Sequence, residues 1–130
     1  METRLLIGGQ FVAGDGESLP VLNPATGKPI VSVAEASTGQ VDAAVAAAAK
    51  AFQTWGRTTP MERAGLLLKL AQTIEDETAD FARLESLNCG KPLARVTADE
   101  LPAVADVFRF FAGAARCLSG SAAKEYLPGH

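Results

Sequence analysis

The sequence has few of the residues that build metal centres and disulfide scaffolds. Its 130 residues include one histidine, His130, and two cysteines, Cys89 and Cys117, which are too few for a disulfide framework or a four-ligand zinc site. Basic residues are also sparse, because 12 Lys and Arg stand against 15 Asp and Glu and give a net charge of −3. No basic stretch could follow a phosphate backbone, so we expect no nucleic-acid partner.

Long apolar runs are absent as well. The first run covers only residues 5–7, which is too short for the core of a signal peptide, and no segment approaches the ~18 apolar residues of a membrane span. We therefore expect a soluble, cytoplasmic protein with reduced cysteines and no membrane contact.

Alanine, in contrast, is abundant. It supplies 24 of the residues, and the 14 leucines outnumber the 12 valines and isoleucines. This composition favours close-packed helices over a β-sandwich, because alanine has the highest helix propensity. The length predicts one domain, which at this size buries about 68% of its unfolded surface.

Residues 1–36 contain short β-type runs separated by glycine and proline. The pair Gly8-Gly9 predicts a two-residue β-hairpin between residues 5–7 and 10–12, because paired glycines supply the positive φ angles of such turns. The turn Asn23–Gly27 then separates a strand at residues 21–22 from another at 30–33. We expect residues 1–36 to form an N-terminal β arm.

About four helices are predicted from residue 37 onward. Ser37 with Gln40, and Thr59 with Glu62, form capping-box patterns, and two further helices are predicted from about residue 78 to 89 and from Thr97. Proline 102 is expected to bend the first turn of the last helix. The first two helices carry apolar stripes that are predicted to face inward, at positions 41, 45, 48, 52 and 55 and at 64, 67, 68, 71 and 74. Two further apolar stripes fall at positions 81, 84 and 87 and at 104, 107, 108, 111, 115 and 118.

No complete set of catalytic groups is found. Cys89 is a candidate nucleophile, but it is predicted at a helix C-terminus, where the dipole disfavours a thiolate, and no histidine base is near it in the sequence. We therefore interpret Cys89 and Cys117 as buried or half-buried structural thiols. Gly27-Lys28 and Gly90-Lys91 lack the spacing of a phosphate loop and are interpreted as turns.

Two acidic groups lie on predicted helices. The group formed by Glu75–Glu77 and Asp80 is interpreted as a solvated face. On the last helix, Asp99, Ala103 and Asp106 fall at positions i, i+4 and i+7 of one face. That face is either only solvated or attracts a cationic ligand by its negative potential.

Six motifs follow one another along the chain, namely Leu6–Val12, Asn23–Gly27, Val41–Val45, Ala51–Trp55, Glu85–Pro92 and Phe110–Ala115. In this order and spacing they resemble the N-terminal portion of the NAD(P)-dependent aldehyde dehydrogenases. The similarity is greatest to bacterial γ-aminobutyraldehyde dehydrogenases, to which Asp106–Leu118 and Glu125–His130 are also similar.

The resemblance implies an α/β enzyme fold, NAD as the cofactor, an aldehyde as the substrate and a homo-oligomer. It implies that residues 37–130 are the helical part of an incomplete NAD-binding domain, whose helices cover a sheet that this chain does not contain. The catalytic cysteine and glutamate of the family lie downstream of the matched motifs. We therefore assign no catalytic or cofactor-binding residue here and expect the chain alone to be inactive.

The resemblance also implies two sites. Four residues are placed at the substrate tunnel, where carboxylates would suit a cationic aminoaldehyde: Asp99, Ala103, Asp106 and Val107. In some relatives a monovalent cation is held by main-chain oxygens, here those of Val21 and Leu22, and by an aspartate whose position is Asn88 here. Because Asn88 is neutral, the cation site is weakened.

An alternative interpretation is a free-standing helical interaction module from a truncated reading frame. Binding of NAD by this chain alone is disfavoured, because no phosphate loop is present. Without the missing sheet, the apolar helix faces are expected to favour oligomers or a loosely packed state.

Overall fold

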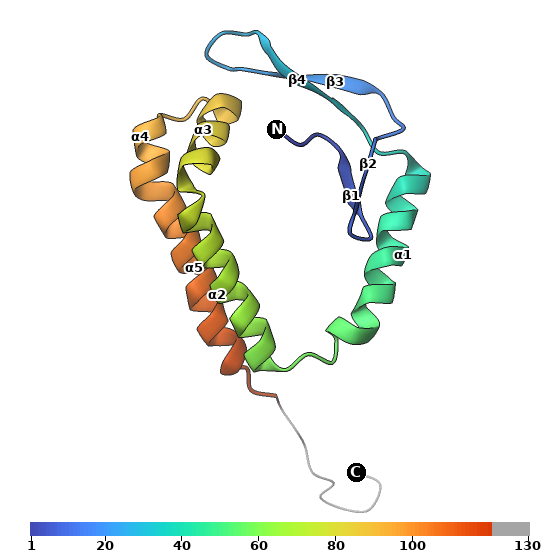
Figure 1. The fold of residues 1–130 in the computed structure, drawn as a ribbon, viewed down its shortest axis with the longest axis vertical. Helices are drawn as coiled ribbons and strands as arrows, with labels where there is room; N and C mark the ends of the chain where they lie inside the picture. The colour runs from blue at the N-terminus through green and yellow to red at the C-terminus, as the bar shows by residue number, and fades with distance from the viewer. Residues whose placement is uncertain (121–130) are drawn as a thin grey trace, which may run out of the picture.

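A computed structural model describes residues 1–120 as two pairs of strands followed by helices (Figure 1). The β3–β4 pair lies between two helical arms, one formed by α1 and the other by α2, α3 and α5. The predicted fold, mainly helical with an N-terminal hairpin and four main helices, is confirmed for this part of the chain. The elements are β1 (Leu5–Ile7), β2 (Gln10–Val12), β3 (Ser18–Leu22), β4 (Pro29–Ala34), α1 (Thr38–Trp55), α2 (Pro60–Asp76), α3 (Thr78–Cys89), α4 (Leu93–Arg95), a π-helical turn (Val96–Glu100) and α5 (Leu101–Arg116).

The strands form two separate antiparallel pairs, β1–β2 and β3–β4. Gly8 and Gly9 make the predicted hairpin turn with φ angles of 58° and 81°, conformations that glycine adopts without a steric penalty. In the second pair Val21 lies opposite Val31. The turn between these strands is closed by a hydrogen bond of 2.9 Å from the Asn23 N–H to the Lys28 carbonyl. Both predicted turns are therefore confirmed.

The start of α1 is fixed by the predicted capping box. The Gln40 N–H donates to the Ser37 hydroxyl at 3.3 Å, and the Gln40 side-chain oxygen accepts from the Ser37 N–H at 3.0 Å. The same amide group also donates to the Ala13 carbonyl at 2.7 Å and accepts from the Asp15 N–H at 3.0 Å. Gln40 therefore joins the helix start to the connection between β2 and β3, which the sequence pattern did not predict.

The second capping box, at the start of α2, is also confirmed. The Glu62 carboxylate accepts the Thr59 N–H at 2.6 Å, and the Glu62 N–H donates to the Thr59 hydroxyl at 3.3 Å. Hydrogen bonds from the backbone and then the hydroxyl of Thr59 lower the pKa of the Glu62 carboxyl. The box thus holds its own carboxylate ionised beside the positive end of the helix dipole.

The core lies where α2 and α5 pack side by side in antiparallel directions (Figure 1). Its buried members are Ala71, Ile74 and Ala105, against which Leu101 and Phe108 pack from the partly buried rim. Small side chains at the contact let the two helix axes approach closely, as the alanine content predicted.

An ion pair closes one side of this helix pair. The Arg109 guanidinium donates two hydrogen bonds to the Glu75 carboxylate, at 2.6 and 2.5 Å, and this contact lowers the pKa of Glu75. Glu75 is therefore not only part of a solvated face, as predicted, but also a link between α2 and α5. Because its folded pKa is lowered, the pair stabilises the fold above about pH 4 and that contribution is lost as the pH falls further.

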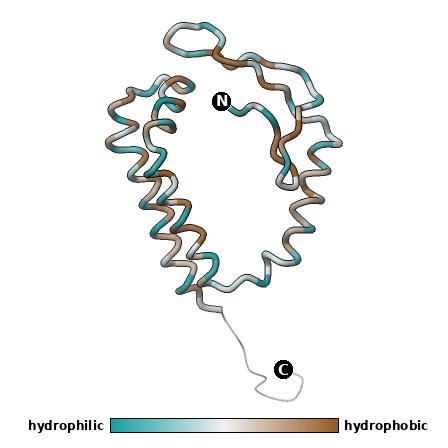
Figure 2. The backbone as a smooth tube through the Cα atoms, in the orientation of Figure 1, coloured by the Kyte–Doolittle hydropathy of each residue, from teal (hydrophilic) through white to brown (hydrophobic). Residues whose placement is uncertain are grey.

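The prediction that the apolar stripe of the first helix, α1, is buried is wrong. No residue of α1 is buried, and its apolar positions Val45 and Phe52 are 64% and 66% exposed. On α5, Val104, Val107 and Phe111 are exposed, and the buried positions are the alanines 105 and 112. The reason is that, within the described residues, α1 packs mainly on the short strand β1. Figure 2 shows hydrophobic residues along α1, on the arm that lies apart from α2 and α5.

The predicted start of the last helix is also wrong. The helical segment begins at Leu93, directly after Pro92, and Thr97 does not cap it, because the Thr97 hydroxyl donates to the Leu93 carbonyl at 2.9 Å. A helix start tolerates a proline, whose missing N–H has no partner there. A π-helical turn follows, in which the Leu101 N–H bonds to the Val96 carbonyl, just before Pro102. Val96 is buried with 1% exposure.

The cysteines differ from the prediction as well. Cys89 and Cys117 are both free and exposed, because each lies at the open C-terminal end of its helix. Of the helices within residues 1–120, none has both the length and the apolar character needed to cross a bilayer.

Candidate functional site

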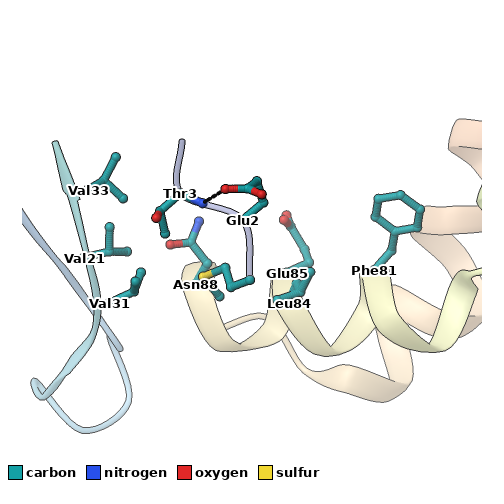
Figure 3. Close-up of a pocket in the computed structure, with 10 residues that line it drawn as sticks. Glu2, Thr3, Val21, Val31, Val33, Phe81, Leu84, Glu85 and Asn88 are labelled. Atoms are coloured by element: carbon teal, nitrogen blue, oxygen red, sulfur yellow. Dashed lines mark hydrogen bonds between the residues drawn. The ribbon is translucent and has the colours of Figure 1, made fainter. Parts of the chain in front are cut away.

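A shallow depression of about 290 Å³ lies where the N-terminal segment meets the β3–β4 pair and α3 (Figure 3). The strands contribute only valines to the lining, and its polar side chains come from the N-terminal segment and from α3. Figure 3 shows the valines of the strands facing the side chains of α3, with Glu2 and Thr3 between them. The lining residues are Met1, Glu2, Thr3, Val21, Val31, Val33, Phe81, Leu84, Glu85 and Asn88.

Both carboxylates of this depression are already paired with cations of the chain. Glu2 is bound by Arg4 at 2.7 Å, and the side-chain hydrogen bond from Arg4 is the main cause that lowers the pKa of Glu2 to about 2. Glu85 is bound by Lys91 at 2.8 Å, which lowers the pKa of the Glu85 carboxyl. The depression therefore offers no unpaired negative charge.

Lys91 has a second partner. Its ammonium lies 2.6 Å from Glu100 in the π-helical turn, and the hydrogen bonds that it donates to Glu100 and Glu85 raise the pKa of Lys91. The cluster of Glu85, Lys91 and Glu100, called here the Lys91 cluster, ties the end of α3 to the start of the next helical segment. No sequence pattern indicated it, because the partners lie across a turn and do not follow the i, i+4 spacing of a helix.

Two of the three residues implied as ligands of a monovalent cation lie at one place in the structure. Val21 and Asn88 line the same depression, and Leu22 follows Val21 at the end of β3. Asn88 contributes a neutral amide, whose one hydrogen bond to another side chain is a long contact of 3.9 Å to the Cys89 sulfur. Within residues 1–120, no three His, Cys, Asp or Glu side chains gather as a metal site. The implied donors are main-chain carbonyl oxygens and one neutral amide oxygen without a carboxylate, so the cation site stays a prediction.

The two Gly-Lys dipeptides are turns, as predicted. Gly27 has a φ of 65° in the turn between β3 and β4, and Gly90 ends α3 with a φ of 74°. Gly90 also faces Pro24, because a methyl group added to Gly90 would lie 2.9 Å from the proline Cγ. The β3–β4 turn therefore packs closely on the end of α3.

Replacing Gly90 by alanine is expected to lower the free energy of unfolding by about 1–2 kcal/mol, because the left-handed conformation is unfavourable for a Cβ atom. The contact with Pro24 adds to this loss. Gly27→Ala is the matched control, since Gly27 has a similar φ but open space around it. Urea unfolding checks the difference, and an equal loss in both variants would mean that the Pro24 contact has no effect.

Of the four residues implied for the substrate tunnel, two line one depression and two lie outside it. Ala103 and Val107 line an apolar depression of about 350 Å³ together with Val104 and Phe108. Asp99 lies in the π-helical turn, where it pairs with Arg95 at 2.8 Å, and Asp106 contributes to the raised pKa of Arg109. Neither carboxylate lines the depression, so the role of these four residues stays a prediction.

The structure gives Cys89 no base that could activate it. The carboxylate that contacts Cys89, that of Glu85, is bound to Lys91, and His130 lies outside the described residues, as do residues 125–129 of the last motif. Within residues 1–120 no glycine-rich loop opens a helix in the manner of a dinucleotide site. The described residues therefore do not fit NAD by themselves.

Comparison with known proteins points to one family. The model of the aldehyde dehydrogenase family matches residues 11–130. Acetaldehyde dehydrogenase 2 of Cupriavidus necator is 41% identical over 115 residues, which are 88% of this chain and 23% of that enzyme.

Solved structures agree. PnpE of Pseudomonas sp. WBC-3, solved in complex with nicotinamide adenine dinucleotide, has a TM-score of 0.88 and 41% identity over 93% of this chain and 25% of its own. Betaine aldehyde dehydrogenase of Staphylococcus aureus, solved with NAD+, has a TM-score of 0.88 and 28% identity over 98% of this chain and 26% of its own. The chain thus spans about a quarter of the length of these relatives.

Proposed function

Because the chain belongs to the aldehyde dehydrogenase family, we propose that it is the N-terminal part of an enzyme that oxidises an aldehyde to the carboxylic acid with NAD+. The observation that supports this best is the structural match to PnpE, with a TM-score of 0.88 over 93% of the chain. In the proposed reaction an aldehyde, water and NAD+ give the acid, NADH and a proton. NAD+, when bound, accepts the hydride.

This segment has a structural role in the proposed enzyme. Residues 1–36 form the β arm, and residues 37–130 form the helical part of the NAD-binding domain. The exposed apolar faces of α1 and α5 support this division, because they are suited to pack on the rest of such a domain. A cytoplasmic location and a homo-oligomeric state belong to the same proposal.

The test compares the 130-residue chain with the full-length protein in an NADH-forming assay. With NAD+ and either 4-aminobutanal or butanal, the full-length protein is expected to form NADH and the chain alone is not. Reproducible turnover by the chain would refute its inactivity. Failure of the full-length protein on both aldehydes would reject the proposed reaction.

We further propose that the substrate is a cationic aminoaldehyde such as 4-aminobutanal. Asp99 and Asp106 support this proposal, because both are exposed carboxylates on the helical segment whose residues 103 and 107 line the apolar depression. Carboxylates near the mouth of an apolar tunnel attract a cationic group and leave a neutral chain unaffected. The likeness to an enzyme named for betaine aldehyde, itself a cation, points in the same direction.

Asp99→Asn and Asp106→Asn in the full-length protein are each expected to raise KM for 4-aminobutanal about two- to fivefold, the range expected for one exposed ion pair. KM for butanal is expected to stay unchanged. Asp42→Asn on α1 serves as the matched control, since Asp42 is equally exposed but lies on the other helical arm. Equal effects on the two aldehydes would reject the assignment.

The free-standing interaction module remains the alternative prediction. Reading the gene beyond codon 130 distinguishes the two, because only the proposed enzyme requires an in-frame continuation into the next segment of the family.

A further inference from the structure

We infer that Lys91 is a positioning residue for the proposed aldehyde site, because it holds the π-helical turn that carries Asp99. The inference rests on the proposed function, in which Asp99 attracts a cationic aldehyde. Lys91 lies in the connection between α3 and α4 and does not line the apolar depression of α5. It therefore acts on the site only indirectly, through the backbone of the turn.

The π-helical turn is the place where the helical segment from Leu93 to Arg116 is least regular. Pro102 has no N–H for the carbonyl of Ala98, and in an α-helix its ring would clash with that carbonyl. The turn lies directly before this proline, and its bond runs from the Leu101 N–H to the Val96 carbonyl. Helices bend at prolines and at π-helical turns. The orientation of the turn relative to α5 is therefore not fixed by helix geometry alone.

Contacts from outside the helix hold the turn at both of its ends. Val96, its first residue, is buried with 1% exposure. Glu100, its last residue, accepts a hydrogen bond of 2.6 Å from the Lys91 ammonium, which also lies 2.8 Å from Glu85 on α3. An ammonium group has three donors, so one lysine can serve both carboxylates. Lys91 thus joins the end of the turn to a second helix.

Asp99 directly precedes Glu100, so its position depends on the residue that Lys91 holds. The partner of Asp99 itself, Arg95, lies 2.8 Å away at i, i+4 spacing in the same helical segment. That pair cannot fix the turn relative to α3, because both of its members move together with the helix. Loss of the contact between Lys91 and Glu100 is therefore expected to shift Asp99 relative to the apolar depression of α5.

The first test measures amide hydrogen exchange of residues 93–101 in the full-length protein by mass spectrometry. Lys91→Met is expected to make exchange in this segment about three- to tenfold faster, the range expected for one or two exposed ion pairs. Lys91→Arg is expected to keep the exchange slow, because a guanidinium can also donate to both carboxylates. Arg95→Met is the matched control, since it removes an exposed ion pair that joins no second element.

Exchange in Lys91→Met no faster than in the Arg95→Met control would overturn the inference, whether or not the protein oxidises aldehydes. Glu100→Gln is expected to give the same acceleration as Lys91→Met, because it removes the contact with the turn and leaves the pair of Lys91 with Glu85. This variant decides the test if Lys91→Met does not fold.

The second test measures KM with the double variant Lys91→Met, Glu100→Gln, which removes the contact without changing the net charge. KM for 4-aminobutanal is expected to rise about two- to fivefold, whereas kcat and KM for butanal are expected to stay unchanged. Equal effects on both aldehydes, or no effect, would overturn the positioning role. If the unmodified full-length protein oxidises neither aldehyde, the proposed reaction and this role are both rejected, and the exchange test still shows whether Lys91 holds the turn.

Discussion

Replacing Ile74 by alanine is expected to lower the free energy of unfolding by about 2–5 kcal/mol. Ile74 is the largest buried side chain of the core cluster, where its buried neighbours Ala71 and Ala105 are too small to fill the space it would leave. Leu101 and Phe108 pack from the rim and are themselves only partly buried. The loss therefore combines the lost transfer energy of the side chain with a cavity between α2 and α5.

The matched control for this variant is Leu66→Ala on the same helix. Leu66 is 51% exposed, so its truncation removes less buried apolar surface and leaves no enclosed cavity. Urea unfolding of the 130-residue chain, followed by circular dichroism of the helices, gives both values. A loss for Ile74→Ala no larger than that for Leu66→Ala would show that the α2–α5 contact does not stabilise the fold.

Replacing Ala105 by leucine is expected to lower the free energy of unfolding by about 1–3 kcal/mol through the opposite defect. Ala105 is completely buried, and it lies in the core cluster with Ala71. Added methyl and methylene groups have no space there, so they force strained rotamers or separate the helices.

Ala46→Leu on α1 controls for the change of residue type. Ala46 is exposed, and leucine and alanine differ little in helix propensity, so a small effect is expected. The same urea experiment compares the variants. The helical circular dichroism signal of Ala105→Leu is expected to be lost at a lower urea concentration, and that of Ala46→Leu is expected to be nearly unchanged. Similar midpoints for both variants would mean that the helices can move apart without a penalty.

The sequence predicted correctly what depends on neighbouring residues. The capping boxes at Ser37 and Thr59 and the turn at Gly8-Gly9 were confirmed, because each is decided within a few residues. It failed where burial depends on a distant partner. Val45 and Phe52 carry the correct helical spacing, but no described element covers them.

The site was predicted to a smaller extent. The family resemblance placed Val21 and Asn88 at one site, and the structure has both lining one depression. The ion pair between Lys91 and Glu100 was not predictable, since it depends on a π-helical turn that no local pattern indicated. The helix start at Leu93 was also missed. A proline is compatible with a position after the end of one helix and with the start of the next, so Pro92 alone did not indicate where the next helix begins.

The pairing of α2 with α5 has a consequence for synthesis on the ribosome. The Glu75–Arg109 contact joins residues 34 positions apart, so the core cannot close until α5 has left the exit tunnel. The hairpins and α1 can form earlier, since their contacts are local. During that interval Ala71 and Ile74 lack the partner helix that later buries them, so this surface of α2 stays uncovered until Ala105 is synthesised.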